Sequence, residues 1–385
     1  MKDNKVLLIG ENHHNILGAV RSFGVNGIYP YGIIVGNDSD KSFVRKSKYW
    51  KKTWTVTSEK NLIAFLLQKF DDEKLKIVII PCSDSIAEII DLNYDILKSK
   101  FILPSIDGKQ GKIAELMDKQ RQVEFAEKYN FLMAKSYIIE LNNILLKDDI
   151  LYPCIIKPVV STDGKKSDIK KISDKDEMMS EFIKLKNSGY CRVLVQEYLN
   201  YDAEYVMIGA IHDSKLAWFN SEKIRIWPVI GGSSSFLRIN NDLVISDFYK
   251  KIRESLIDIK YDGCFDIDAF CVNGKMYLNE INWRNSGAVY STLASKVYYP
   301  VLWYYWTIGK NIPGDMKITC DDKTICSMDE SKDLRHVACK NISFKRWIKD
   351  HKQTKAFSLW NIRDIKPAII QYIHLVKKLI IRKGV

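Results

Sequence analysis

Two strands joined by a tight turn, in residues 264–284, constrain the fold of this chain more than any other feature. Asn273-Gly274 is typical of two-residue hairpin turns, and it separates the strand-like runs CFDIDAFCV and KMYLNEINWR. Side chains alternate along a strand, so the second run places one set on a single face: Leu278, Glu280, Asn282 and Arg284. The sequence therefore predicts an antiparallel hairpin that carries a row of polar groups.

The first strand adds carboxylates to this row. Asp266 and Asp268 share a face, and if it coincides with the face of Glu280 and Asn282, four oxygen-bearing side chains gather on one patch. Carboxylate and amide oxygens without His or Cys suit a hard cation, and Mg²⁺ is usually held by carboxylates together with phosphate oxygens. Arg284 beside them would neutralise a phosphoryl or carboxylate group. This chemistry favours a metal–phosphate site over the alternative, a solvated polar face.

The first 112 residues alternate between buried-strand patterns, such as KVLLIG and KIVIIP, and amphipathic-helix patterns, such as NILGAVRSFG. This order predicts a small doubly wound α/β domain. Its first turn, GENHHN, lacks the glycine pattern of a dinucleotide-binding loop, which weighs against hydride transfer. His13 and His14 still follow the first strand at its carboxyl end, where such sheets bind ligands, although a polar loop without a role is an equal alternative.

The rest of the chain contains a charged amphipathic helix at 113–130, a strand-rich stretch, and a hairpin turned at His212-Asp213. Beyond about residue 310 the pattern is irregular, then helical and basic. We expect four units, with the boundaries 1–112, 113–190, 191–310 and 311–385.

Two further groups have the chemistry of a nucleotide site. Lys157 ends an apolar strand beside a loop with Lys165 and Lys166, and such a lysine can contact a phosphate chain, although most strand-end lysines are only solvated. Glu197 follows the strand RVLVQ, and Glu204 lies seven residues on. A group here could accept from an adenine amine, and a second carboxylate could bind ribose hydroxyls, but neither group decides the matter alone.

Taken together and in this order, the pieces resemble the ATP-grasp superfamily. The resemblance spans roughly residues 1–310, with IIKP, QEYL, KIR and FDID…LNEINWR in the order of the family, and the last is close to its Glu-Ile-Asn-Pro-Arg. It implies ATP and Mg²⁺ as cofactors. It also implies an α/β fold in which a small doubly wound domain precedes a two-subdomain nucleotide clamp, here followed by a basic helical appendage.

The resemblance assigns nucleotide contacts to particular residues. Lys157 is similar to the strand lysine that contacts the phosphates, and Lys119 to an earlier lysine with the same target. The hinge that contacts adenine corresponds to Glu197 and to the backbone of Tyr198-Leu199, and Glu204 corresponds to the acid that binds ribose.

It also assigns the chemistry. Lys223 and Arg225 would face phosphate and acyl groups, and Arg284 would clamp the acyl phosphate. The metal ligands would be Asp268, Glu280 and Asn282.

Two departures from the family pattern bear on the acceptor. Trp283 stands where the family has proline, which indicates a different acceptor pocket, and the loop STDGKKSD is poorer in glycine than many family lids. The segment KIRIWPVIGGSSSF resembles the carboxylate–amine ligases that include D-aspartate ligase and proteins encoded with cell-envelope polysaccharide genes. Gly232, Ser233 and Ser234 could then supply backbone N–H groups to substrate, with His13 as a further contact; a flexible surface turn is the alternative.

The resemblance implies a two-step reaction, in which ATP phosphorylates a carboxylate and an amine then displaces phosphate, acting on an envelope or polysaccharide precursor. One alternative is a carboxylase or kinase without an amine acceptor. Another is a nucleotide-binding regulator without catalysis. The acid and the amine are not identified by the sequence.

Charge is uneven along the chain, because residues 334–385 hold 13 Lys or Arg and two acids, whereas the rest is near neutral. This distribution argues against a nucleic-acid binder. We expect small-molecule substrates, a cytoplasmic location and eight reduced cysteines. The final helix carries apolar residues at helical spacing, Ile369, Tyr372, Ile373, Val376, Leu379 and Ile380. It could pack on the protein or a homodimer, or lie on an anionic membrane.

Overall fold

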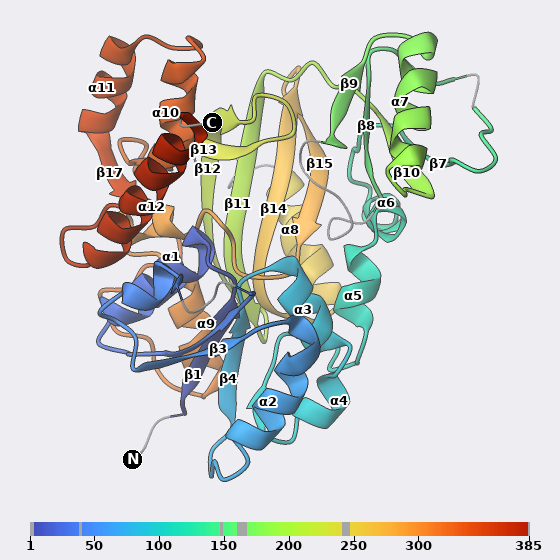
Figure 1. Ribbon diagram of the computed structural model, residues 1–385. Helices are drawn as coiled ribbons and strands as arrows, with labels where there is room; N and C mark the ends of the chain where they lie inside the picture. The colour runs from blue at the N-terminus through green and yellow to red at the C-terminus, as the bar shows by residue number, and fades with distance from the viewer. Residues whose placement is uncertain (1–3, 38–40, 147–148, 160–167, 241–246, 384–385) are drawn as a thin grey trace.

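The computed structural model describes residues 4–37, 41–146, 149–159, 168–240 and 247–383. Three sheets organise the chain, and Figure 1 shows the largest running through the middle of the molecule. The predicted fold class is confirmed: a small doubly wound domain precedes a clamp built on two further sheets, and the C-terminal region is largely helical. Lys165 and Lys166 lie outside the described residues.

The N-terminal domain has a parallel sheet in the order β3-β2-β1-β4-β5. Its central strands are fully buried because helices cover both faces, as their apolar runs predicted. The strands are β1 (Val6–Gly10), β2 (Tyr31–Val35), β3 (Lys52–Val56), β4 (Ile77–Pro81) and β5 (Phe101–Ile102). The helices are α1 (His14–Gly24), α2 (Leu62–Lys69), α3 (Asp84–Asp91) and α4 (Tyr94–Leu97), with the short turns η2 (Val44–Lys46) and η3 (Glu59–Asn61). Since β1 and β4 are parallel neighbours, the loops after them meet at one edge.

Two helices follow where one was expected at 113–130. They are α5 (Lys112–Met117) and α6 (Lys119–Lys128), and Asp118 separates them. The prediction of a single helix was wrong because Asp118 adopts an extended conformation and its carboxylate caps α6, accepting hydrogen bonds from the backbone N–H groups of Gln120 and Arg121.

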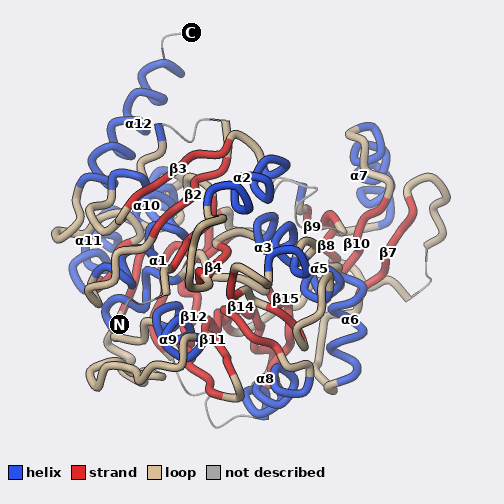
Figure 2. Tube along the Cα trace, turned by 90° about the horizontal axis from the view of Figure 1, so that it is seen from below, coloured by secondary structure: helices blue, strands red, loops and turns tan. Residues whose placement is uncertain are grey.

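The first half of the clamp is an antiparallel sheet in the order β7-β10-β8-β9, backed by helix α7 (Lys175–Asn187). Its strands are β7 (Ser136–Glu140), β8 (Cys154–Pro158), β9 (Lys170–Ile172) and β10 (Arg192–Glu197). Strand β10 belongs to this sheet although it follows the expected boundary at residue 190. In Figure 2 this sheet and α7 stand at one side of the molecule.

The large sheet has the order β15-β14-β11-β12-β13-β16-β17, and β6 (Ser105–Ile106) pairs with β14 beside it. The strands are β11 (Ala203–His212), β12 (Lys215–Trp227), β13 (Ser233–Ile239), β14 (Tyr261–Val272), β15 (Lys275–Asn282), β16 (Cys326–Met328) and β17 (Thr354–Phe357). Asn273 and Gly274 turn the β14–β15 hairpin with φ of 49° and 72°, as predicted. The β11–β12 hairpin turns at Asp213-Ser214, one residue later than expected.

The two faces of this sheet pack on different cores. Val206 and Ile208 point to α1, α9 (Tyr299–Thr307) and η6 (Val289–Ala294), whereas Met207 and Phe265 point to α6 and α8 (Asp247–Asp258). Further along the first face the side chains become polar, beginning at Glu204. The candidate site therefore lies where an apolar sheet face ends.

The C-terminal region packs closely on the rest of the molecule. Its helices are α10 (Glu330–Ala338), α11 (Phe344–Gln353) and α12 (Lys366–Lys383), while β16 and β17 extend the large sheet. Arg21 of α1 is fully buried, and its guanidinium bonds to the Asp364 carboxylate at 3.0 Å and to the carbonyl of Leu359 at 2.8 Å. This contact joins the two ends of the chain.

All eight cysteines are described and free; five are buried, whereas Cys191 and Cys339 are exposed. In the described part of the chain, no helix combines the length and apolar character needed to span a bilayer.

Candidate active site

Strands β14 and β15 bring the predicted oxygen ligands together. Asp268 lies opposite Glu280, and Asp266 lies opposite Asn282. Residues directly opposite in an antiparallel pair share a face, so the condition set by the sequence pattern is met.

One detail of the predicted alternation was wrong. The register shifts between Asp268 and Ala269, which makes Asn279 an extra residue in β15. Leu278 therefore pairs with Ala269 and is 2% exposed in the core on the far side, instead of sharing the face of Glu280. The bulge lets an apolar side chain and a carboxylate two residues apart point in opposite directions.

Helix α6 aims Lys119 at this patch. One helical turn further on, the Gln122 side-chain amide donates to the Ile281 carbonyl at 3.0 Å and accepts from the Ile281 N–H at 3.1 Å. This anchor fixes the helix against β15, and the Lys119 ammonium meets the Glu280 carboxylate at 2.5 Å. Although Asp118 was not recognised as a cap, its position explains why Lys119 begins the helix here.

Lys157 faces the patch from the other half of the clamp. Its ammonium donates to the Gln196 side-chain oxygen at 2.9 Å. Burial, with the nearby Lys119 charge, lowers the pKa of Lys157 to about 8. Burial alone would raise the pKa of Glu280, but Lys119 and Lys157 outweigh it and lower that pKa to about 2. The patch therefore combines a fixed negative charge with an easily deprotonated lysine.

Lys223 lies between the predicted ribose-binding acid, Glu204, and a predicted metal ligand, Asp268. Its ammonium lies 2.8 Å from the Glu204 carboxylate and 2.7 Å from the Asp268 carboxylate. The lysine side chain is 4% exposed, and the two carboxylates more than offset burial, so its pKa is raised. The predicted ribose acid and the predicted metal ligand thus lie within reach of one cation.

Arg284, just after β15, is held between two domains. Its guanidinium lies 2.9 Å from Asp266 of β14 and 3.0 Å from Asp84 at the start of α3. These carboxylates outweigh burial and raise the pKa of Arg284. The preceding Trp283 is 1% exposed and faces the core beside Phe125. That its replacement of proline changes the acceptor pocket stays a prediction.

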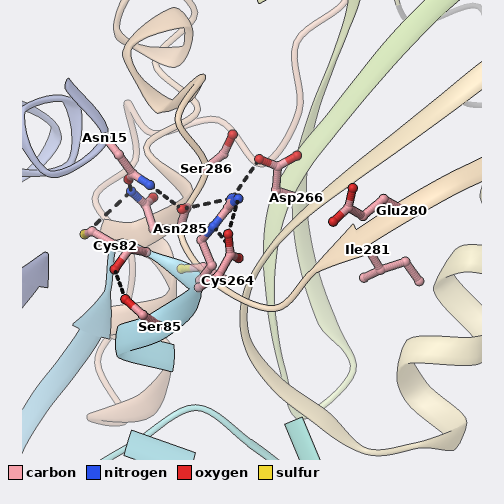
Figure 3. A network of polar contacts seen from close by, with 12 residues as sticks. Asn15, Cys82, Ser85, Cys264, Asp266, Glu280, Ile281, Asn285 and Ser286 are labelled. Atoms are coloured by element: carbon pink, nitrogen blue, oxygen red, sulfur yellow. Dashed lines mark hydrogen bonds and ion pairs between the residues drawn. The ribbon is translucent and has the colours of Figure 1, made fainter. Parts of the chain in front are cut away.

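A buried asparagine pair fixes the loop that follows. Asn285 accepts from Asn15 of α1 through its backbone carbonyl at 2.8 Å, and its side-chain oxygen accepts from the Tyr299 hydroxyl at 2.7 Å. Its backbone N–H donates to the Pro81 carbonyl at the end of β4. Figure 3 shows Asp266 between this network and Glu280, so the polar cluster continues across the domain junction.

The two histidines adjoin the same loop. The centroids of their rings lie 3.8 Å apart. Both rings face Gly287, where an added Cβ would lie 3.7 Å from His14 Nε2 and 3.9 Å from the His13 ring. His13 also caps α1 through Nδ1, and His14 Nδ1 lies 3.7 Å from Asp329. The prediction that His13 faces substrate is untested, but the structure sets it beside the residues that follow Arg284.

Arg225 does not join the cluster around Lys223. Register shifts flank it in β12, and its guanidinium bonds to Asp333 at 2.8 Å and Asp350 at 2.6 Å, both in the C-terminal region. These bonds hold the Arg225 guanidinium to two carboxylates, and its expected contact with phosphate or acyl groups stays a prediction.

The neighbouring segment is largely a strand rather than a surface turn. Ser233 and Ser234 of β13 pair with Trp227 and Ile226 of β12. A Cβ at Gly232 would lie 1.9 Å from the Pro228 carbonyl oxygen, so this close approach requires glycine.

At the hinge the side chains alternate. Gln196 pairs with Ile155 and shares the face of Lys157, whereas Glu197 pairs with the buried Cys154 and points to the opposite face. The ring of Tyr198 lies under the Lys171 ammonium, 3.6 Å from its centroid. Leu199 follows. Gln196, rather than the side chain of Glu197, is thus the polar group presented toward Lys157.

Among the described residues, no group of three or more His, Cys, Asp or Glu side chains has a metal-binding arrangement. The predicted set differs in kind, since it combines two carboxylates with the amide of Asn282.

No protein-family model matches the sequence, and no curated protein matches it. Solved structures do. A Staphylococcus aureus N5-carboxyaminoimidazole synthetase complexed with ADP has a TM-score of 0.61 at 15% identity, over 81% of this chain and 79% of that one. The biotin carboxylase domain of the Hydrogenobacter thermophilus 2-oxoglutarate carboxylase has a TM-score of 0.62 at 12% identity, over 83% and 73%. A Bacillus licheniformis L-amino acid ligase has a TM-score of 0.59 at 11% identity, over 79% and 74%.

The chain has the ATP-grasp fold. At these identities the likeness concerns the fold alone, and it agrees with the three-part order that the sequence resemblance implied. Within the ATP-grasp fold, the junction between the N-terminal domain and the large sheet carries residues that the sequence interpretation missed, above all Asp84 and Asp329. Asp84 had a usable signal, since it follows the carboxyl end of a parallel strand. Asp329 had none, because it reaches His14 only through tertiary packing.

Proposed function

We propose that the protein is an ATP- and Mg²⁺-dependent carboxylate–amine ligase that forms an acyl phosphate. One observation carries the proposal: Asp268, Glu280 and Asn282 share a sheet face that ends at Arg284, with Lys157 facing it from the other half of the clamp. Structural neighbours solved with ADP, or with MgADP and bicarbonate, support the nucleotide and the metal.

In this proposal ATP lies between the two clamp sheets. Lys119 and Lys157 contact its phosphates, the backbone of Glu197, Tyr198 and Leu199 contacts adenine, and Glu204 binds ribose. Gln196, already bonded to Lys157, holds that lysine in place. Without ligands, Lys223 neutralises the carboxylates of Glu204 and Asp268. With Glu204 on ribose and Asp268 on the metal, Lys223 would contact phosphate.

The donor set fits Mg²⁺. The carboxylates of Asp268 and Glu280 lie opposite each other on paired strands, and each forms an ion pair with a lysine. Asn282, two residues after Glu280, adds a neutral oxygen. When bound, Mg²⁺ would neutralise negative charge that develops during phosphoryl transfer.

The chemistry requires two steps. A substrate carboxylate oxygen attacks the γ-phosphorus, the bond to the bridging oxygen breaks, and ADP leaves. The amine nitrogen then attacks the acyl carbon, inorganic phosphate leaves, and the amine loses a proton. Arg284, held by Asp84 and Asp266, orients the carboxylate and stabilises the acyl phosphate.

The remaining predicted residues act around the substrate in this proposal. His13 contacts substrate, and the backbone of Gly232, Ser233 and Ser234 donates to it. Arg225 positions that strand through Asp333, to which Ser235 also donates at 2.8 Å. We further propose, from the sequence resemblance, that a cytoplasmic enzyme joins an amino acid or similar amine to a cell-envelope or polysaccharide precursor.

Release of ADP in the presence of candidate carboxylates, each with and without an amine, tests the function. We expect release to need a carboxylate, and hydroxylamine to trap the acyl phosphate as a hydroxamate. Transfer of oxygen-18 from carboxylate to phosphate would follow from the same step. Release with bicarbonate alone would favour a carboxylase, and nucleotide binding without turnover across the panel would favour a regulator.

A further inference from the structure

From residue 334 onward, the described charged side chains that reach the surface are all positive. The two acids of this segment, Asp350 and Asp364, are 0% and 3% exposed and are bound to Arg225 and Arg21 respectively. The Lys and Arg side chains described there are all exposed: Arg335, Lys340, Lys345, Arg346, Lys349, Lys352, Lys355, Arg363, Lys366 and Lys377. Internal ion pairs thus keep both acids of this segment away from the surface.

Helix α12 has two distinct faces. Ala368 is fully buried, and Ile370 and Tyr372 pack on the core that the N-terminal domain shares with the large sheet. The Tyr372 hydroxyl donates to Glu330 at 3.0 Å. The helix therefore packs on its own protein, as one of the two alternatives expected. The side chains of Val376, Leu379 and Ile380 lie outside the described part.

The other face of α12 is unusual for a solvated helix. Lys366, Ile369, Ile373 and Lys377 are exposed at spacings of three, four and four, which places them on one stripe. Ile369 is 46% and Ile373 48% exposed, and Ile362 just before the helix is 83% exposed. A polar stripe would be expected on a surface with no partner.

A second basic segment adjoins this stripe. Turn η2, in a stretch of six Lys or Arg and no acid at 41–52, packs against α12. The backbone N–H of Lys48 donates to Asp364 at 2.9 Å, across 316 residues of sequence. Exposed Lys46 and Lys48 therefore lie close to α12. We define the basic-apolar face as Lys46, Lys48, Lys366, Ile369, Ile373 and Lys377.

We propose that the basic-apolar face binds the anionic surface of a lipid bilayer. Lysines at both ends of the stripe meet lipid phosphates and carboxylates, while the isoleucines between them enter the interfacial layer. A second copy of the chain is disfavoured because the face would meet its own positive charge. A nucleic-acid backbone would satisfy the lysines but would leave the isoleucines in water. The proposal does not depend on the catalytic one.

Co-sedimentation of the full chain with vesicles tests the proposal, using phosphatidylcholine alone and phosphatidylcholine with about a third of phosphatidylserine. We expect binding to the anionic vesicles only, weakened by salt. Reversing Lys46, Lys48, Lys366 and Lys377 to Glu should lower partitioning at least about a hundredfold, since each lysine contributes about fivefold.

The variant Ile369→Ser with Ile373→Ser keeps all charges and should also lose most binding. Lys175→Glu with Lys186→Glu is a control for charge reversal elsewhere on the protein, because both lysines are exposed on α7, on the side of the molecule opposite α12 in Figures 1 and 2. It should bind as the unmodified chain does. Circular dichroism would verify folding of each variant.

Three results would overturn the proposal. The full chain could stay in the supernatant with anionic vesicles at low salt. The double-serine variant could bind unchanged, which would indicate a site for a polyanion such as nucleic acid. Finally, sedimentation velocity could show a dimer that the double-serine variant loses, which would make the face a contact between copies.

Discussion

Glu280 stays charged against the cost of burial, because Lys119 and Lys157 hold its pKa at about 2. Glu280→Gln keeps the shape of the side chain but removes the charge that the proposed metal needs. We expect ADP release to fall by about a hundredfold or more at saturating Mg²⁺, with the fold retained by circular dichroism. Glu222→Gln is the control, since Glu222 pairs with Arg238 on the same sheet outside the cluster. Turnover close to that of the unmodified chain in Glu280→Gln would remove Glu280 from the metal site.

Lys157 gives the site a dependence on pH. Its pKa of about 8 in the free protein reflects burial and the Lys119 charge, and a bound phosphate chain would raise it again. Nucleotide binding should therefore take up a proton above about pH 8, and affinity should fall by up to about tenfold per pH unit there. Below that pH the lysine is already charged, so affinity should be flat.

Calorimetry with a non-hydrolysable ATP analogue, in buffers of different ionisation enthalpy, measures the uptake. Lys157→Arg stays charged and should abolish the slope, while Lys157→Ala should weaken binding throughout. Parallel pH profiles for the unmodified chain and Lys157→Arg would rule out this lysine as the source.

For single residues, the sequence predicted which side chains lie close together, but not which residues bind them. Alternation along two strands sufficed to group Asp268 with Glu280. The Asp84 partner of Arg284 required knowledge of how separate elements dock, because Asp84 lies 200 residues away in the sequence. Glu204 and Lys223, by contrast, lie on the paired strands of the β11–β12 hairpin. Glu197 shows the limit of reading a strand end, since the side chain turned away from Lys157 at the last position of β10.

Among the elements, the break between α5 and α6 matters most for the site. Asp118→Ala removes a cap with two backbone hydrogen bonds, which should lower the free energy of unfolding by about 1 kcal/mol. It should also raise the KM for ATP, because Lys119 begins the helix that the cap fixes. Asp174→Ala is the matched control: Asp174 caps α7 in the same way, and its loss should lower stability similarly with KM unchanged. Equal KM effects in both variants would contradict a specific role for the α6 cap.

Elements with a strong local signal were predicted well. The Asn273-Gly274 turn and the buried runs of the first domain follow from backbone conformation and apolar pattern alone. The α5–α6 break was missed because the apolar spacing continues across Asp118, and the bulge at Asn279 because nothing in the alternation marks it.

For the molecule as a whole, the Arg21–Asp364 pair should decide whether the C-terminal region stays in place. Asp364→Ala leaves a fully buried guanidinium without its counter-charge and should lower the free energy of unfolding by about 3–5 kcal/mol in denaturant titrations. Replacing both partners, Arg21→Met with Asp364→Leu, should cost less than the two single changes together. Asp321→Ala, at an exposed acid, should change stability by no more than about 0.5 kcal/mol. A small effect of Asp364→Ala would mean that the region is held mainly by apolar contacts.

The hydrogen bonds of Gln122 have a consequence beyond aiming Lys119. Strand β15 is an edge strand of its sheet, and the unpaired backbone groups of an edge strand can form hydrogen bonds with another protein chain. The Gln122 amide occupies both groups of Ile281, and the Leu132 carbonyl accepts from the N–H of Leu278 at 2.7 Å. Side chain and loop together act as a substitute for a neighbouring strand. The strand that carries Glu280 and Asn282 is thereby protected from intermolecular β-pairing, and hence from aggregation, at the point where the proposed metal and nucleotide would bind.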